Sequence, residues 1–380
     1  MMMLLLVPCS IFLRFYFLDN ALVEPHPWRQ GQTAVTILHF FNGTINFFDY
    51  RSPLNGILWN NVYEFPLYQK IVATLMATGL SLAIAARLVT LFAFSIVTFL
   101  VFKVSHRCFG LRVAAWSLLF MLVSPFNIIY SRVCLIDFTA LAFAFGSLTI
   151  AVEYGLFRNW RPRAYTLFTL IGMLASLCKV TIWFPVCFSI VLLLLHQMVS
   201  DRKLKKPTIM LAISLIVQTA TALAWMRWAN HTRSESGVLT ATSWLFGAMQ
   251  KRFELQNWAI IASTFVRSVL WDWMLIPFVI GVFVAIRKRS MVLLAVLCAS
   301  LVSILITFTV HVHHDYYFIG EMPYLLLTAA VGMAFLWDRP GRFYWILIAI
   351  IAAMFCQRLT KIKYWADNIF RDYHTEENVV

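Results

Sequence analysis

The stretch that decides the fold is residues 81–102, SLAIAARLVTLFAFSIVTFLVF. It is almost wholly apolar, and about 20 helical residues are enough to cross the hydrocarbon core of a bilayer. Lipid offers backbone groups no hydrogen-bond partners, so a spanning segment must satisfy them internally, as a helix does. The stretch therefore predicts a transmembrane helix.

Similar apolar runs recur along the whole chain. Hydrophobic residues make up 61% of the sequence and charged residues only 13%, whereas a soluble domain carries about 25% charged residues. The alternating pattern of a membrane barrel is missing. We therefore predict an all-α, polytopic transmembrane helical bundle of about eleven spans. Their predicted ranges are 1–18, 81–102, 112–130, 135–157, 163–178, 182–199, 207–226, 268–286, 291–310, 321–337 and 343–357.

Charge predicts the orientation of the bundle. Basic residues gather in alternate short loops, near 103–112, 158–163, 202–206, 287–289 and 339–342. Cytoplasmic loops of membrane proteins are enriched in Lys and Arg, so these loops should face the cytoplasm. The net charge of +14 then reflects topology, and we predict no nucleic-acid partner.

The acidic residues lie mostly on the opposite side. Of 17 Asp and Glu, only Glu153, Asp201 and Asp338 fall on or near the basic loops. None lies near the centre of a predicted span, where ion-coupled carriers and proton pumps usually keep an ionisable residue. Any chemistry should therefore occur at the outer face.

Two outer segments are long, at about 19–80 and 227–267. Within the first, residues 33–41 and 66–79 read as amphipathic helices lying on the membrane interface. The second also has the pattern of an amphipathic cap. Because no linker or repeat divides the chain, we predict one integral-membrane domain, residues 1–380.

Four groups of reactive residues occupy the outer segments. Residues 24–30 (EPHPWRQ) follow the first span, and residues 63–68 (YEFPLY) begin the second amphipathic helix. Arg132 and Asp137 lie where one span ends and the next begins, and residues 311–317 (HVHHDYY) precede the tenth span. Prolines stiffen the first group, which would hold a carboxylate, an imidazole and a guanidinium close together.

These groups resemble, in order, the motifs of the GT-C membrane glycosyltransferases. The similarity is to the branch with the protein O-mannosyltransferases and the lipid A aminoarabinose transferase. The family patterns are H-x-W-R-Q-x-D-T-A, E-x-P-L-Y, an Asp before the fourth span, L-T-K and H-D-Y-Y. They are matched here by residues 26–34, residues 64–68, Asp137, Lys179 and residues 314–317. Two positions differ: Gln32 stands where the family often has Asp, and Phe65 where aminoarabinose transferases have Lys.

The resemblance implies an inverting transfer of a sugar from a polyprenyl-phosphate donor to a lipid, glycan or protein acceptor at the outer face. Glu24 is then the candidate catalytic base, with His26 behind it. Cationic groups or a divalent metal would stabilise the leaving phosphate. Glu64 and Asp137 would organise the site or bind the metal. The residues expected to hold the phosphate are Arg29, Lys179, His314 and Tyr317.

Each of these residues also has a plainer interpretation. Glu24 could be a solvated loop acid, Glu64 a charge favoured at a helix start, and Asp137 a helix cap. Lys179 could extend towards the interface to reach water. The tyrosines could belong to an aromatic belt.

Two other functions are compatible with the same composition. A transporter or flippase of a lipid-linked substrate would need charged groups lining a path through the membrane. A subunit of a larger assembly would tolerate substitution of the outer groups. For the enzyme, the expected location is a bacterial inner membrane, or alternatively the endoplasmic reticulum.

Cysteine-accessibility labelling tests the orientation. Cysteines introduced near Arg51 and Glu235 should react from one side of the membrane, and cysteines near Lys205 and Lys288 from the other, since basic loops stay cytoplasmic. If the Arg51 and Lys205 positions react from the same side, the span assignment is wrong.

Overall fold

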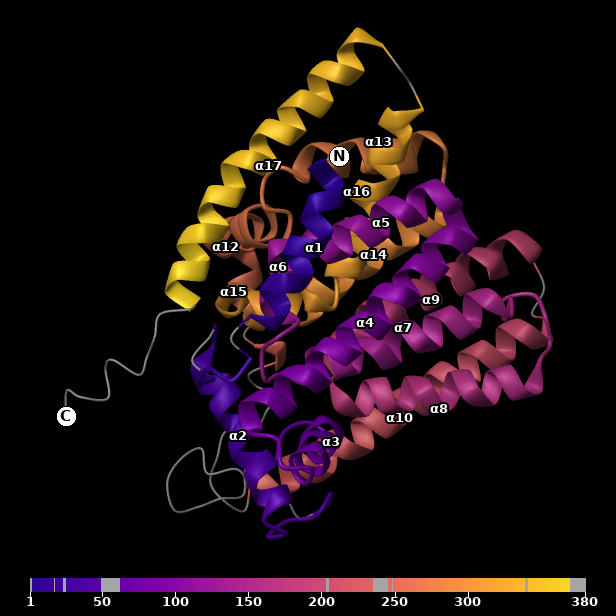
Figure 1. Ribbon diagram of the computed structural model, residues 1–380. Helices are drawn as coiled ribbons and strands as arrows, with labels where there is room; N and C mark the ends of the chain where they lie inside the picture. The colour runs from indigo at the N-terminus through magenta and orange to yellow at the C-terminus, as the bar shows by residue number, and fades with distance from the viewer. Residues whose placement is uncertain are drawn as a thin grey trace.

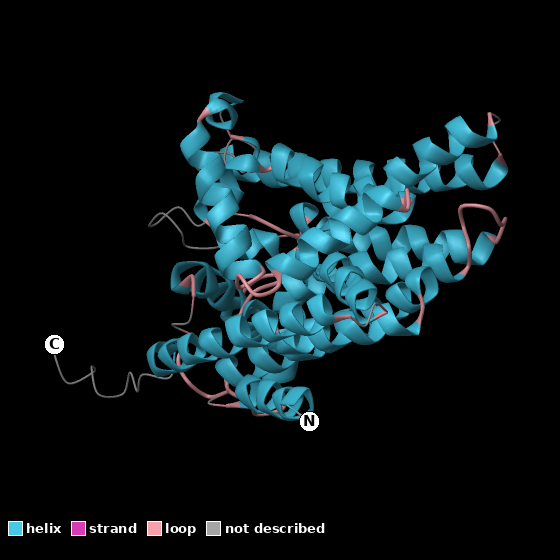
Figure 2. Cartoon of the chain, turned by 90° about the horizontal axis from the view of Figure 1, so that it is seen from above, coloured by secondary structure: helices cyan, strands magenta, loops and turns pink. Residues whose placement is uncertain are grey.

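The structure is a computed structural model, and it describes residues 2–16, 18–22, 25–48, 62–202, 205–234, 245–247, 249–338 and 341–369. The described part of the chain consists of helices and loops, without strands (Figure 2). Its first half contains α1 (Met2–Phe15), α2 (Pro27–Phe41), α3 (Leu67–Met76), α4 (Leu82–Phe109), α5 (Leu111–Val123), α6 (Pro125–Tyr130), α7 (Asp137–Glu153), α8 (Pro162–Cys178) and α9 (Val180–Asp201). Its second half contains α10 (Lys206–Ser234), η1 (Met249–Phe253), α12 (Leu255–Thr264), η2 (Phe265–Val269), α13 (Leu275–Arg287), α14 (Met291–Ile306), α15 (Phe308–His313), η3 (Asp315–Ile319), α16 (Met322–Trp337) and α17 (Arg342–Ile369).

Every predicted span falls on a helix, so the prediction of a polytopic transmembrane helical bundle is confirmed. In the described chain, α4, α9 and α10 are long and apolar enough to cross a membrane by length and composition. Shorter apolar helices of 10–17 residues make up much of the rest. Several predicted ends were wrong, because Ser124-Pro125 breaks one span into α5 and α6, and α10 runs on to Ser234.

The bundle is arranged around α7 and α16. The helices α4, α8 and α9 pack against α7, while α5, α13 and α14 pack against α16 (Figure 1). Residues 322–334 of α16 are buried along their whole length. The helices predicted at 33–41 and 66–79 are present as α2 and α3, which pack together at one end of the bundle; α3 ends at Met76, and the place of both helices on the membrane interface stays a prediction.

Buried arginines fix the first outer segment on this end. Arg87 in α4 is fully buried, and its guanidinium donates to the carbonyls of Leu18 and Asn20 at 2.7 and 2.6 Å. Arg132 donates to the carbonyls of Leu13 and Tyr16, where α1 ends. Helix ends leave such carbonyls without backbone partners, so charged donors are an effective cap. These arginines therefore hold the segment in place as structural residues.

Two glycines allow α13 and α16 to cross at close range. A Cβ atom on Gly332 would lie 1.9 Å from the carbonyl oxygen of Pro277, and one on Gly281 would lie 1.9 Å from that of Thr328. Small residues are the usual means by which membrane helices approach each other closely. The contact depends on the absence of both side chains.

We expect Gly332→Ala to destabilise the bundle, because the added methyl group forces backbone apart. The loss of unfolding free energy should be about 1–3 kcal/mol, the range of overpacked cores. Thermal unfolding of the detergent-purified protein measures the effect. Gly31→Ala in α2 is the control, since nothing lies within 4 Å of its added Cβ. Equal melting temperatures for the two variants would contradict the close crossing.

Candidate functional site

The end of the bundle that carries α2 and α3, which we call the site end, gathers the motif residues into one polar cluster. Four segments far apart in sequence meet there: the start of α2, residues 63–66 before α3, the start of α7, and the loop from α15 into η3. Lys179 joins them from the break between α8 and α9. The ion pairs and ring contacts described below connect all five.

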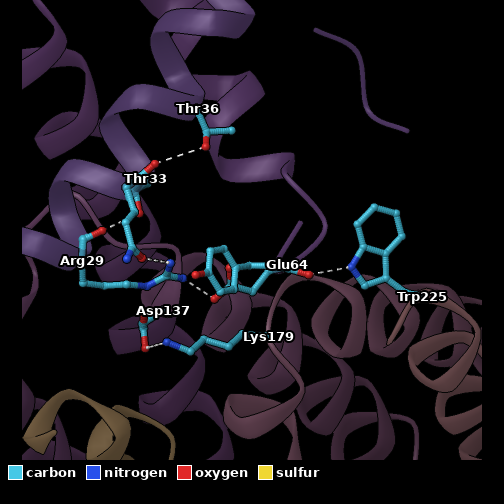
Figure 3. Close-up of polar contacts among 9 residues, drawn as sticks. Arg29, Thr33, Thr36, Glu64, Asp137, Lys179 and Trp225 are labelled. Carbon is cyan, nitrogen blue, oxygen red and sulfur yellow. Dashed lines mark hydrogen bonds and ion pairs between the residues drawn. The ribbon is translucent and has the colours of Figure 1, made fainter. Parts of the chain in front are cut away.

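The first pair joins Arg29 and Glu64. The Arg29 guanidinium donates to the Glu64 carboxylate and to Oε1 of Gln32 at 3.1 Å, and it lies 5.4 Å from the ring centre of Tyr63 (Figure 3). Gln32 therefore keeps the acceptor that an Asp would supply at this position. Pro27 occupies the first turn of α2, a position suited to proline, and so helps to orient Arg29.

Glu64 is also positioned through the backbone of its two neighbours, Tyr63 and Phe65. The N–H of Phe65 donates to the carbonyl of Leu177 at 3.1 Å, and the indole of Trp225 donates to the carbonyl of Tyr63 at 3.0 Å. The Phe65 ring packs edge-on against Trp225. A lysine at position 65 is thus replaced here by an aromatic contact that ties the loop to α10.

The second pair lies deeper. Lys179 Nζ donates to Asp137 Oδ1 at 2.7 Å, and the two side chains are only 4% and 1% exposed. The ammonium also lies 4.8 and 4.7 Å from the ring centres of Tyr316 and Tyr317. Lys179 is therefore held inside the protein and does not extend to water. Asp137 Oδ1 accepts from Lys179 and Oδ2 has no hydrogen-bond partner among the described residues, so Asp137 does not cap its helix and both plainer interpretations were wrong.

The third contact of the cluster joins the imidazole of His26 to the carboxylate of Asp315. His26 Nε2 lies 2.7 Å from Asp315 Oδ1, and the hydroxyl of Tyr130 donates to the same oxygen at 2.6 Å. His26 has a left-handed backbone, with φ of 61°, which few residues other than glycine adopt. Its ring packs against Tyr316 and His314. The side chains of His26 and Asp315 are 23% and 31% exposed, so this part of the cluster is the most open to solvent.

The contacts of this cluster shift the pKa values of Glu64, Asp315 and His314 and so determine which of these side chains are charged. Burial would raise the pKa of Glu64, but the charges of Arg29 and Lys179 outweigh it and hold that pKa below its usual value. Burial would likewise raise the pKa of Asp315, yet hydrogen bonds from His26 and Tyr130 keep it low. Burial, with His26 and His313 nearby, lowers the pKa of His314 to about 4. At neutral pH both carboxylates are therefore charged and His314 is neutral.

Sequence reasoning found most of this cluster but not all its parts. Arg29, Glu64, Asp137, Lys179, His26, His314 and Tyr317 all lie in it, whereas Glu24 is outside the described residues. Asp315 stands within the quoted H-D-Y-Y motif, but no role was predicted for it. Tyr130 was missed entirely; its place directly before Ser131-Arg132 at a span end was the only signal. Arg132, grouped with Asp137 from sequence, turns away to cap α1.

Solved structures share this fold. ArnT from Cupriavidus metallidurans, bound to undecaprenyl phosphate, matches with a TM-score of 0.61 and 18% identity, over 92% of this chain and 63% of that one. Its apo state matches with a TM-score of 0.55 and 17% identity over the same shares. The oligosaccharyltransferase of Archaeoglobus fulgidus, crystallised with zinc and sulfate, matches with a TM-score of 0.51 and 11% identity, over 93% of this chain and 52% of that one.

Both neighbours are GT-C glycosyltransferases. The chain has the GT-C fold. The resemblance seen in the motifs is thereby confirmed at the level of structure. No family model matches the sequence, and no curated protein is significantly similar to it. The chain spans 63% of the length of ArnT, and identities of this size show the fold alone.

GT-C relatives raise the question of a metal, and the described residues do not fit one. Among them, no group of three or more His, Cys, Asp or Glu could hold an ion. Glu64 and Asp137, the predicted metal ligands, are each already bonded to a cation. We therefore derive no chemical step through a metal.

A double-mutant cycle tests the buried ion pair between Lys179 and Asp137. Lys179→Met should lower the free energy of unfolding by about 3–5 kcal/mol, because Asp137 is left charged and alone in an apolar interior. The double variant Lys179→Met, Asp137→Leu should recover most of that loss, since neither charge is then buried. Mixed-micelle unfolding titrations of the purified proteins measure both. A double variant as unstable as the single one would show that the ion pair is not what holds this region.

Proposed function

We propose that this chain is an inverting glycosyltransferase that moves a sugar from a polyprenyl-phosphate donor to an acceptor. The observation that carries the proposal is the convergence, at one end of a GT-C fold, of Arg29, Lys179 and a carboxylate-held His26. The structure of ArnT with undecaprenyl phosphate supports a polyprenyl-linked donor. We propose that the whole chain works as one domain.

The two cations suit a leaving phosphate. When the glycosidic bond breaks, its electron pair stays on the phosphate oxygen, so the lipid phosphate gains one negative charge. Arg29 has five N–H donors and Lys179 has three, and in the described chain the contacts above use only part of each set. Glu64 and Asp137 hold the cations in position, which avoids reorganisation during the reaction. His314 and Tyr317 line the same cluster and complete the phosphate-binding set.

The acceptor hydroxyl must lose a proton as it attacks the anomeric carbon, and His26 is the described residue best suited to take it. Asp315 also accepts from Tyr130, and because a carboxylate only accepts, the nitrogen facing it, Nε2, carries the hydrogen. Nδ1 is then the nitrogen that can receive the acceptor's proton. Asp315 would stabilise the resulting imidazolium. Glu24, two residues earlier in the chain, stays a proposed alternative base.

The distribution of buried charge favours an enzyme over a transporter. The charged residues buried in the described chain include Arg14, Arg87, Arg132, Asp137, Lys179 and Glu321. They gather at the site end. There Lys179 pairs with Asp137 and Glu321 lies 3.6 Å from His311, while the arginines donate to the Ser131 hydroxyl or to backbone carbonyls. A carrier for a charged substrate needs such groups along its path. We propose that the site faces the outer side of a bacterial inner membrane, or alternatively the lumen of the endoplasmic reticulum.

Glu64→Gln tests the site directly. The substitution keeps the shape of the side chain but removes the charge that orients Arg29, so sugar transfer should fall about 100-fold or more, the scale of one lost electrostatic contact in a site. The assay measures transfer from radiolabelled polyprenyl-phosphate sugars to acceptor-containing membranes.

Glu153→Gln is the matched control. Glu153 lies at the opposite end of α7, where it pairs with Lys103 at 3.7 Å on the surface, so its loss should leave transfer nearly unchanged. Normal transfer by the Glu64→Gln protein would refute the assigned site. An inactive wild-type protein with every such donor would instead favour the transporter.

A further inference from the structure

A cavity opens at the end of the bundle opposite the cluster described above. Its volume is about 770 Å³, and it lies among the basic-loop ends of α4, α7, α9 and α14 and reaches the first turn of α16. Small-molecule pockets in proteins have volumes of about 300–1,000 Å³. The cavity is therefore large enough for a specific ligand, and the proposed glycosyl transfer does not use it.

The cavity is deep and mostly apolar. It extends along α9 from Ser189 to Ser200, which corresponds to about 17 Å at 1.5 Å per helical residue. Its walls include Val101, Leu148 and Val296, which are buried side chains. A slot of this length with hydrocarbon walls suits an extended hydrocarbon chain, because burying such a chain removes its apolar surface from water.

The mouth of the cavity is positively charged. Arg107, Arg158 and Lys205 line it. Lys205 is largely neutralised by Asp201, at 2.9 Å. Within the described chain, Arg107 and Arg158 form no ion pair, and both are exposed at the rim. The mouth thus offers two guanidinium groups to an anion, and guanidinium is the side chain that matches a phosphate best.

Three residues that line the cavity carry a buried polar atom without a hydrogen-bond partner among the described residues. The atoms are Ser105 Oγ, Gln197 Oε1 and Tyr324 Oη. A serine within a helix usually bonds back to the carbonyl four residues earlier, as Ser95 and Ser189 do here. Buried polar atoms without a partner cost free energy, so these positions point to a ligand that supplies hydrogen bonds.

We propose that this cavity binds an anionic phospholipid. The phosphate would lie against Arg107 and Arg158, head-group hydroxyls would reach Ser105 and Gln197, and one hydrocarbon chain would fill the slot. Basic loops are expected on the cytoplasmic side, where anionic lipids concentrate and basic pockets between helices bind their head groups. The proposal does not depend on the glycosyltransferase assignment.

Native mass spectrometry of the detergent-purified protein tests the proposal, with phosphatidylglycerol as the probe. Wild-type protein should retain one phosphatidylglycerol far more than phosphatidylcholine, which shares its chains and phosphate but has no net charge. Arg107→Gln with Arg158→Gln should reduce the bound fraction at least about 10-fold, the effect of losing roughly 1.4 kcal/mol of binding free energy. Ser105→Phe, which fills the slot with an apolar ring, should reduce it similarly.

The control is Arg287→Gln with Lys288→Gln, which removes two positive charges at the same end outside the cavity lining. It should bind phosphatidylglycerol like the wild type. The proposal is overturned if the control loses binding equally, or if Ser105→Phe binds normally while keeping the wild-type melting temperature. It is also overturned if inorganic phosphate alone displaces the lipid, since the site would then recognise a small anion.

Discussion

The ion pair between Lys179 and Asp137 is the interaction on which the site end depends. Both charges are almost completely removed from water, and such a pair repays its desolvation only when the geometry is good and further contacts assist. Here Tyr316 and Tyr317 place two aromatic rings beside the ammonium. The pair joins the start of α7 to the break between α8 and α9, and the η3 tyrosines pack on it. The ion pair therefore fixes these three separate parts of the chain relative to one another.

A network of charged and polar contacts then extends from this point to the surface. The charge of Lys179 acts on Glu64, which binds Arg29, and Arg29 is fixed in α2 beside the strained turn at His26. His26 in turn is held by Asp315, at the start of η3. The exposed fraction of these side chains rises outward, from Asp137 to Asp315. Buried charges therefore anchor the network, and its outer end, at His26 and Asp315, is the part most open to solvent.

Sequence predicted the fold well because hydropathy is a local property. Each span is specified by its own apolar run, and the motif order placed Arg29, Glu64, Asp137, Lys179 and residues 314–317 at one end. Partners were not predictable, since Asp315 meets His26 across 289 positions and nothing local marks that contact. The same limit explains Arg132: an arginine at a span end can bind substrate or cap a helix, and only the position of α1 decides.

The two departures from the GT-C motifs show which properties of the site matter. At position 32 an amide replaces a carboxylate, yet its oxygen still accepts from Arg29.

At position 65 a phenylalanine replaces a lysine, so the cluster has one positive charge fewer. The charged groups that remain are the cations Arg29 and Lys179 and the carboxylates Glu64, Asp137 and Asp315, of which Asp315 is bonded to His26. In the proposed function, the directed N–H donors of Arg29 and Lys179 would hold the phosphate of an anionic donor, and the apolar bundle would hold its lipid. Had an Asp stood at position 32, the cluster would hold one further carboxylate. The amide therefore keeps an acceptor for Arg29 without adding a negative charge.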